Sequence, residues 1–233
     1  MRKLTLLDLG QRDYSEVWHI QEDLVKEVIS GASQDTLILV EHTPVVTLGR
    51  QGSEEDVLVS FEDLSRRGIQ FFKVDRGGRA TFHGPGQLVA YPILSLLGQD
   101  RDIHNYLRNL EAVIIGLLAG LDLRGEGKED QAGVWIDEQK VASIGVGVKK
   151  WVTYHGLALN VDIDLDYFSL IDPCGVGQAK ITSLAKVLSS QVRMDKIKKS
   201  FVSSFSEVFK RMPIPESYSS FPSERCQEMA SFR

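Results

Sequence analysis

The chain has 233 residues and a mass of 26.0 kDa, with 42% hydrophobic and 25% charged residues. These proportions are typical of a globular protein and exclude a disordered, collagen-like or coiled-coil chain. Its 27 basic and 32 acidic residues give a net charge of −5, which argues against binding of nucleic acid through overall charge.

Apolar residues in the first half of the chain follow strand and helix periodicities in turn. A strand is predicted at residues 3–9, followed by a helix at residues 13–29 with Asp13 as its N-cap. Further strands are predicted at residues 36–42, 45–49, 69–75, 79–83 and 87–94, and a short helix at residues 61–68 ends at Gly68.

The second half begins with the clearest helix, whose apolar residues form a wide stripe between Asp102 and Leu121. Residues 133–137, 140–148 and 152–163 then predict consecutive antiparallel strands. A last helix is predicted to carry Ile197, Phe201, Phe205, Val208 and Met212, within a tail of 56 residues that contains no glycine. Strands outnumber helices and mostly follow one another, which favours an α+β fold with a mixed, mostly antiparallel sheet flanked by helices. We expect one domain at residues 1–212 and a C-terminal tail at residues 213–233.

Three features bear on the compartment in which the protein works. No stretch approaches about 18 consecutive apolar residues, so we expect no membrane span. The first residues turn polar too soon for a signal peptide and lack the arginine and serine of a transit peptide. The two cysteines, Cys174 and Cys226, do not suggest a disulfide framework, and we expect a cytoplasmic protein.

Glycine is concentrated in the segment from Arg76 to Gln87, where four of the ten residues 77–86 are glycine. The segment matches neither a P-loop nor a dinucleotide-binding motif. A β-hairpin with tight turns would account for the glycines alone. The polar residues enclosed among them, which are Arg76, Arg79, Thr81, His83 and Gln87, suit an anionic or carbonyl-bearing ligand instead.

Cys174 and Lys140, both in the second half of the chain, are candidates for a role in nucleophilic catalysis. Cys174 lies in a Pro/Gly loop before a helix predicted near Ile181, where a helix dipole would favour its thiolate. Lys140 lies 34 residues earlier and is a cation that could lower the pKa of a thiol and carry its proton. An incidental loop cysteine and an exposed lysine at the start of a strand are the alternatives. Cys226 lies in a polar tail and is given no role.

The remaining polar features are less specific. His155 precedes Gly156 in a predicted strand, where the glycine could let a ligand chain lie against the backbone. The five histidines lack zinc-ligand spacing, so no metal is expected. Three lysines, Lys196, Lys198 and Lys199, could form a basic face for an acidic carrier protein, or simply a solvated helix surface.

Five stretches, in this order, resemble the octanoyltransferases of lipoate biosynthesis. They are EHTPVVTLGR, RGGRATFHGPGQLVAYPI, GVWIDEQKVASIGV, HGLALNVDIDL and PCG followed by TSL. The resemblance runs from Leu37 to Leu184 and implies the α/β module that biotinyl and lipoyl protein ligases share.

The resemblance also implies roles for individual residues. Cys174 resembles the nucleophile that receives the octanoyl group as a thioester, and Lys140 resembles its activating partner. Substrate-binding positions are implied at Arg76, Gly77, Gly78, Arg79, Ala80, Thr81, Phe82 and His83, and as walls of the acyl site at Ser143, Ile144, Gly145, Gly156, Leu157 and Ala158. Backbone N–H groups near Gly145 or Gly175 are candidates for stabilising the tetrahedral oxyanion.

The implied donor is octanoyl-acyl carrier protein. The implied acceptors are the lipoyl domains of 2-oxoacid dehydrogenase complexes and the H protein of glycine cleavage. No cofactor is expected, because exchange between thioesters needs no ATP. Two alternatives remain open: an ATP-dependent lipoate or biotin ligase, and a binding module without catalytic activity.

Overall fold

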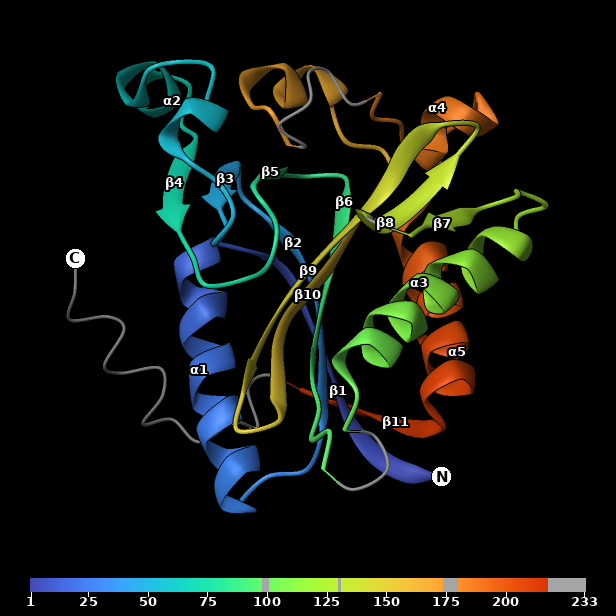
Figure 1. Cartoon of the computed structure of the whole chain (residues 1–233). Coiled ribbons are helices and arrows are strands. Elements are labelled where there is room, and N and C mark those ends of the chain that lie inside the picture. Colours follow the sequence, from blue (N-terminus) through green and yellow to red (C-terminus); the bar gives the residue numbers. More distant parts are fainter. Residues whose placement is uncertain (98–100, 130, 174–179, 218–233) are drawn as a thin grey trace.

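A large sheet separates two layers of helices in the computed structural model of the chain (Figure 1). The structure describes residues 1–97, 101–129, 131–173 and 180–217. Across the sheet, the described strands are β11 (Arg211–Glu216), β1 (Arg2–Arg12), β2 (Thr36–His42), β6 (Gln87–Ile93), β10 (Val152–Asn160), β9 (Gln139–Lys149), β8 (Gln131–Ile136) and β7 (Glu126–Lys128). The pairs β1–β11 and β1–β2 are parallel and the others are antiparallel. The predicted α+β class and mostly antiparallel sheet are therefore confirmed.

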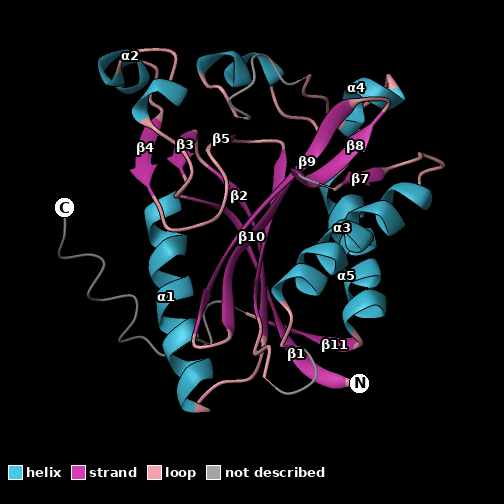
Figure 2. Ribbon diagram, viewed as in Figure 1, coloured by secondary structure: helices cyan, strands magenta, loops and turns pink. Residues whose placement is uncertain are grey.

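Each face of the sheet buries a different set of side chains. In β2 the side chains of Ile38 and Val40 pack against α1 (Tyr14–Ser30), whereas Leu37 and Leu39 point to the other face. The other face is covered by α3 (Ile103–Ala119) and α5 (Met194–Phe209), as Figure 2 shows. Both faces of β2 are buried because helices cover both, and this explains its nearly continuous apolar sequence.

A smaller sheet packs beside the start of α1. It contains β4 (Gln70–Lys73), β3 (Val45–Leu48) and β5 (Ala80–His83), with β3 in the middle. Tyr14 and Trp18 of α1 contact Val45 and Phe72 of this sheet. Short helical segments complete the described fold: η1 (Glu54–Asp56), α2 (Phe61–Arg66), η3 (Leu165–Leu170) and α4 (Leu184–Leu188).

The end of the last helix differs from the prediction. The helix α5 ends at Phe209, and Met212 lies in β11, which pairs in parallel with β1 and includes residues 213–216 of the predicted tail. Lys210 caps the helix in a left-handed conformation with φ of 52°. Pro213 and Pro215 cannot continue a helix, but an edge strand tolerates proline because one side of the strand needs no ladder partner.

The start of α1 also differs from the prediction in one respect. Asp13 occupies the N-cap position, but its side chain makes no hydrogen bond to the helix. Its Oδ1 instead accepts a hydrogen bond from the Thr43 hydroxyl at 2.6 Å, so the carboxylate joins the start of α1 to the turn after β2.

No described helix is long and apolar enough to cross a membrane.

Candidate active site

One pocket brings together residues from both sheets, from the start of α1 and from the loop before β5. It is lined by Tyr14, Arg76, Gly78, Arg79, Ala80, Thr81, His83, Val89, Tyr91, Lys140, Ser143, Ile144, Gly145, His155, Gly156, Leu157, Ala158 and Pro173. Val89, Tyr91 and Ala158 belong to the face of the large sheet that packs on α1, so the pocket lies on that side. Segments that are far apart in the sequence therefore contribute to the same pocket.

The pocket contains most of the residues that the sequence singles out. Gly77 and Phe82 are not among the lining residues: Phe82 is fully buried and stacks on Tyr167, with 4.5 Å between the ring centroids. Cys174 lies outside the described residues, but Pro173, the residue before it, lines the pocket. The chain thus reaches the pocket wall one residue before the candidate nucleophile.

Lys140 lies at the start of β9 and is held through its main chain by the segment that follows Cys174. Its N–H donates to the carbonyl of Lys180 at 2.8 Å, and its carbonyl accepts the N–H of Thr182 at 3.0 Å. The Lys140 Nζ lies 5.0 Å from the ring centroid of Trp135, within the range of a cation–π interaction. The segments on both sides of residues 174–179 are therefore anchored at this pocket.

Arg76 is buried, and its guanidinium is committed to the protein. It donates to the carbonyls of Thr47 at 2.7 Å, Gly77 at 2.9 Å and Arg79 at 2.9 Å, and also to the Thr47 hydroxyl. Because these donors already have acceptors, Arg76 shapes the glycine-rich loop from within. An anion would find few of its N–H groups available.

Arg79 links the same loop to the segment that leads to Cys174. Its guanidinium pairs with the buried carboxylate of Asp56 in η1. The carbonyl of Asp56 accepts the N–H of Asp172 at 2.7 Å, and Val57 forms an isolated antiparallel bridge with Ile171. The loop, η1 and the residues before Pro173 therefore form one connected wall.

Two glycines of the predicted acyl site are required by backbone packing. A Cβ atom on Gly145 would lie 2.7 Å from the carbonyl oxygen of Gly77, because the glycine-rich loop crosses β9 at that point. A Cβ on Gly156 would overlap the carbonyl oxygen of Ala90 in the adjacent strand and lie 2.7 Å from Cδ of Pro92. The glycines let protein backbone approach closely, which sets the shape of the pocket.

His83 and His155 line the pocket, His42 lies against the lining residue Tyr91, and burial lowers the pKa of each of these three histidines. The pKa of His42 falls to about 4 and that of His83 to about 3, so both are neutral at pH 7. His42 Nδ1 donates to the carbonyl of Arg12 at 3.1 Å, which leaves Nε2 to accept the Tyr91 hydroxyl at 2.8 Å. Burial also lowers the pKa of His155, whose Nε2 donates to Asp75 at 2.9 Å.

Sequence reasoning missed the lining residues Tyr14, Val89 and Tyr91, and it noted His155 and Pro173 only as neighbours of Gly156 and Cys174. Val89 and Tyr91 alternate along β6, so a period-two pattern could have assigned them to one face, but it could not have told which face holds the pocket. Tyr14 reaches the pocket only because α1 begins beside the small sheet. His155 faces it because its φ of 54° interrupts the regular alternation of β10.

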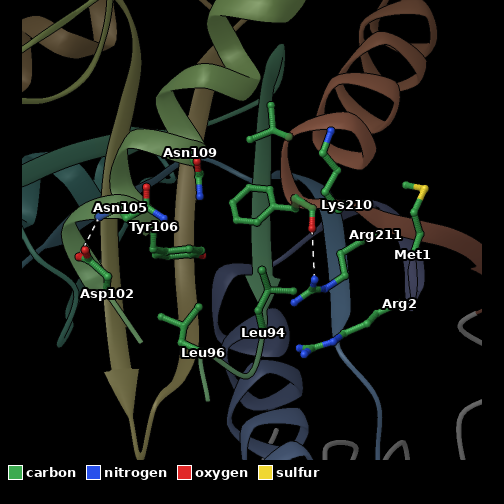
Figure 3. A pocket seen from close by; sticks show the side chains of 12 residues that line it. Met1, Arg2, Leu94, Leu96, Asp102, Asn105, Tyr106, Asn109, Lys210 and Arg211 are labelled. Atoms are coloured by element: carbon green, nitrogen blue, oxygen red, sulfur yellow. Dashed lines mark hydrogen bonds between the residues drawn. The ribbon is translucent and has the colours of Figure 1, made fainter. Parts of the chain in front are cut away.

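A larger cavity lies at the far end of β6, on the side of α3 and α5 (Figure 3). Its walls include Met1, Arg2, Tyr106, Asn109 and Lys210, together with Arg211. The Arg211 Nε donates to Asp35 at 3.1 Å, so this arginine already has a carboxylate partner. None of the predicted site residues lines this cavity, and it is not our candidate active site.

The predicted basic face lies away from the pocket. Lys196, Lys198 and Lys199 belong to α5, which covers the opposite face of the large sheet (Figure 1). The Lys198 ammonium donates to Asp8 at 2.7 Å. Among the described residues, no group of three or more His, Cys, Asp or Glu side chains is arranged to hold a metal ion.

Comparison with known proteins identifies the family. The lipoyl protein ligase A/B catalytic domain matches residues 13–206. An octanoyltransferase of Syntrophotalea carbinolica is 43% identical over 207 residues, which cover 89% of this chain and 95% of the relative.

Solved structures with the same fold are more distant in sequence. A bipartite lipoate protein ligase from Thermoplasma acidophilum, studied together with its E2 lipoyl domain, has a TM-score of 0.76 at 19% identity and covers 100% of this chain and 93% of its own. A biotin protein ligase from Aquifex aeolicus in complex with biotin and ATP has a TM-score of 0.55 at 13% identity, covering 90% and 71%. At these identities the likeness concerns the fold, and it agrees with the module expected from the sequence.

Proposed function

The chain belongs to the lipoyl protein ligase A/B catalytic domain family and is an octanoyltransferase of lipoate biosynthesis, and from this premise we propose that it works through a thioester on Cys174 that Lys140 helps to form and to discharge. The observation that carries this proposal is the pocket itself. It contains Lys140, the glycine-rich loop and Pro173, which precedes Cys174.

In the first half-reaction, the Cys174 thiolate attacks the carbonyl carbon of octanoyl-acyl carrier protein. The thiol proton passes to Lys140 and then to the departing thiolate of the carrier, so one thioester replaces another. A free thiol has a pKa of about 8.5, and a nearby ammonium group favours its ionised form. The exchange requires no ATP because the thioester is already activated.

In the second half-reaction, the amine of an acceptor lysine attacks the carbonyl carbon of the Cys174 thioester. The carbon–sulfur bond breaks, an amide forms, and Lys140 takes a proton from the amine and returns it to the cysteine sulfur. The acceptors are lipoyl domains. In this proposal they are the lipoyl domains of 2-oxoacid dehydrogenase complexes, together with the H protein of glycine cleavage. The acyl chain would lie along Ala158 and along the backbone of Ile144 and Leu157, whose side chains pack into the core on the other face of the sheet.

The remaining residues of the glycine-rich loop and of β5 have supporting roles in this proposal. Gly78, Ala80, Thr81 and His83 line the pocket and would contact the donor's acyl group, whereas Arg76 and Arg79 hold the loop in place. Gly77 and Phe82 do not line the pocket and would stabilise its wall without contacting the acyl group. The ring of Phe82 packs on Tyr167, whereas the adjacent residues Thr81 and His83 line the pocket.

The test of the reaction class is transfer without ATP. Purified protein is incubated with octanoyl-acyl carrier protein and an apo lipoyl domain, with and without ATP, and acceptor octanoylation is followed by intact-mass spectrometry. We expect equal transfer in both mixtures. Transfer that depends on ATP would support the alternative ligase reaction, and absence of transfer from an intact donor would support a binding module.

The test of the cysteine uses matched variants. With octanoyl-acyl carrier protein alone, the wild type and Cys226→Ala should each gain one octanoyl group, and Cys174→Ala should gain none. When an apo lipoyl domain is added, Cys174→Ala should also lack turnover. Lys140→Ala should lose rate and raise the pH at which iodoacetamide alkylates Cys174. Full turnover by Cys174→Ala would refute the thioester on Cys174 but leave the octanoyltransferase assignment intact.

A further inference from the structure

Two buried side-chain amides lie behind the candidate active site. Gln87 and Asn160 are register partners where β6 pairs with β10, and their exposures are 2% and 5%. The Gln87 Nε2 donates to the Asn160 Oδ1 at 2.9 Å. Neither residue is among those that line the pocket, and the mechanism above uses neither. A pair of buried amides is costly unless its groups are bonded, so its partners indicate what it does.

The contacts fix which way each amide points. The Gln87 Nε2 also donates to the carbonyl of Phe82 at 3.2 Å, and a carbonyl accepts only, so this atom must be nitrogen. The Gln87 Oε1 therefore faces Nδ1 of His83, at 2.7 Å. On the other side, Asn160 accepts on Oδ1 and donates through Nδ2 to the carbonyl of Thr182 at 2.9 Å.

This orientation determines the tautomer of His83. The ring is neutral at pH 7 because burial lowers its pKa, and an amide oxygen can only accept. The proton of the neutral ring is therefore on Nδ1, and Nε2 has a lone pair. Among the described residues no donor is bonded to Nε2, and His83 lines the pocket. The ring thus offers the pocket a hydrogen-bond acceptor.

The other end of the amide pair supports Lys140. Asn160 holds the carbonyl of Thr182, and the N–H of Thr182 donates to the Lys140 carbonyl at 3.0 Å. The Lys140 N–H in turn donates to Lys180 at 2.8 Å. One continuous set of hydrogen bonds therefore runs from His83 through Gln87, Asn160 and Thr182 to the main chain of Lys140.

We propose that Gln87 and Asn160 are positioning residues of octanoyl transfer: they hold His83 as the Nδ1-protonated tautomer, with an acceptor at Nε2 for the N–H of the attacking lysine amine, and they tether the segment that bears Lys140. This inference rests on the proposed function, since it takes the amine as the second substrate and Lys140 as the proton carrier. An Nε2–H group would instead face the amine with a competing donor. The positions of both His83 and Lys140 would then depend on the hydrogen bonds of Gln87 and Asn160.

The tautomer can be measured without any variant. Long-range ¹H–¹⁵N correlation spectra of ¹⁵N-histidine-labelled protein distinguish Nδ1–H from Nε2–H, and exposed His19 serves as an internal reference. We expect His83 to be the Nδ1–H tautomer and to stay so from pH 5 to pH 8. Protonation of Nε2, or titration of His83 within this range, would overturn the proposal. This result does not depend on Cys174 and stands or falls separately from the proposed function.

The substitution Gln87→Glu tests the consequence for the reaction. A carboxylate beside Nδ1 would favour the imidazolium form, which carries a proton on Nε2. We expect His83 to titrate between pH 5 and 8, and aminolysis of the Cys174 thioester to slow by tenfold or more at low pH and recover as His83 deprotonates. Octanoylation of Cys174 by the donor should change less. Gln11→Glu, at an exposed position of β1, is the matched control. An unchanged pH–rate profile would overturn the proposal.

The substitution Asn160→Asp tests the tether to Lys140. It keeps the acceptor for Gln87 but places a carboxylate oxygen against the Thr182 carbonyl. We expect both half-reactions to slow by roughly tenfold, the rate equivalent of one lost hydrogen bond, with KM little changed and the His83 tautomer retained. Asn109→Asp, on α3 away from the pocket, controls for the added charge. Wild-type rates in a folded Asn160→Asp protein would overturn this part.

Discussion

The Asp75 carboxylate accepts a hydrogen bond from Nε2 of His155 at 2.9 Å, across 80 positions of the chain. His155 has a left-handed backbone, with φ of 54°, inside strand β10. Its N–H is held by the side chain of Gln21, whose Oε1 lies at 2.8 Å. These two long-range bonds maintain an unfavourable conformation directly before Gly156, at the wall of the pocket.

We therefore expect Asp75→Asn to destabilise the protein by about 1–3 kcal/mol at pH 7, because His155 and the Tyr154 hydroxyl donate to different carboxylate oxygens and an amide has an acceptor at only one of these two positions. Urea unfolding followed by circular dichroism measures the change. The hydrogen bond from His155 is the main cause that lowers the pKa of Asp75 to about 2, below its ordinary value of 3.8. The stabilisation is therefore present above pH 4 and is lost as pH falls toward 2.

Asp23→Asn is the control for that substitution, since Asp23 forms an ion pair with exposed Lys26 on the surface of α1. Exposed pairs contribute little, so its free energy of unfolding should stay within about 0.5 kcal/mol of the wild type. Equal stability of Asp75→Asn and the wild type at pH 7 would contradict the role of Asp75.

Stability should also fall steeply below pH 6.5, through the buried histidines. His42, His83 and His155 have folded pKa values below the ordinary 6.5, so each binds its proton more readily after unfolding. Stability from these groups is present above pH 6.5 and is lost as pH falls. Each contributes a slope of about 1.4 kcal/mol per pH unit where only the unfolded form is protonated.

Thermal unfolding between pH 7 and pH 5 measures this slope. The variant His42→Gln should flatten it, whereas His19→Gln, at an exposed position of α1, should leave it unchanged. A melting temperature that does not change over this range would show that the three rings are not buried in neutral form.

Gly145→Ala should distort the glycine-rich loop. The new methyl group would lie 2.7 Å from the Gly77 carbonyl and 3.3 Å from Cδ of Arg76, so the loop must move. We expect a loss of about 1–3 kcal/mol in stability, as for overpacking elsewhere, and a larger proportional loss of octanoyl transfer. Gly120→Ala, where the nearest atom to an added Cβ is 3.4 Å away, is the control and should keep both. Retention of wild-type transfer by Gly145→Ala would contradict the close approach.

Trp135 should contribute to the rate through Lys140. The Lys140 Nζ lies 5.0 Å from the centroid of this ring, and a cation–π interaction is worth about 0.5–1 kcal/mol, or two- to fivefold in rate. We expect Trp135→Leu to lower kcat by this factor and Trp135→Phe to retain most of it. Since Trp135 is buried, the two variants are compared at equal folded fraction, checked by circular dichroism. Equal rates for Leu and Phe would remove the role of the aromatic face.

Local patterns in the sequence were enough to determine the class of the fold and the positions of most elements. Period-two and helical periodicities are local properties, and they found β2, β6, β9, β10, α1 and α3. The motif RGGRATFHGPGQ, with Lys140 and Cys174 after it, was enough for the family, because a long ordered set of residue types is hard to match by chance.

Only the tertiary structure decided how individual residues are used. Arg76 had the pattern of a ligand-binding arginine, yet its donors are taken by carbonyls of Thr47, Gly77 and Arg79. The prolines of β11 find their partner in β1, about 200 residues earlier, which no local pattern indicates. The tautomer of His83 depends on the orientation of Gln87, which depends on Asn160 in another strand. Hydrogen-bond partners are set by contacts between distant segments, so they follow from the assembled sheets and not from the order of residues along the chain.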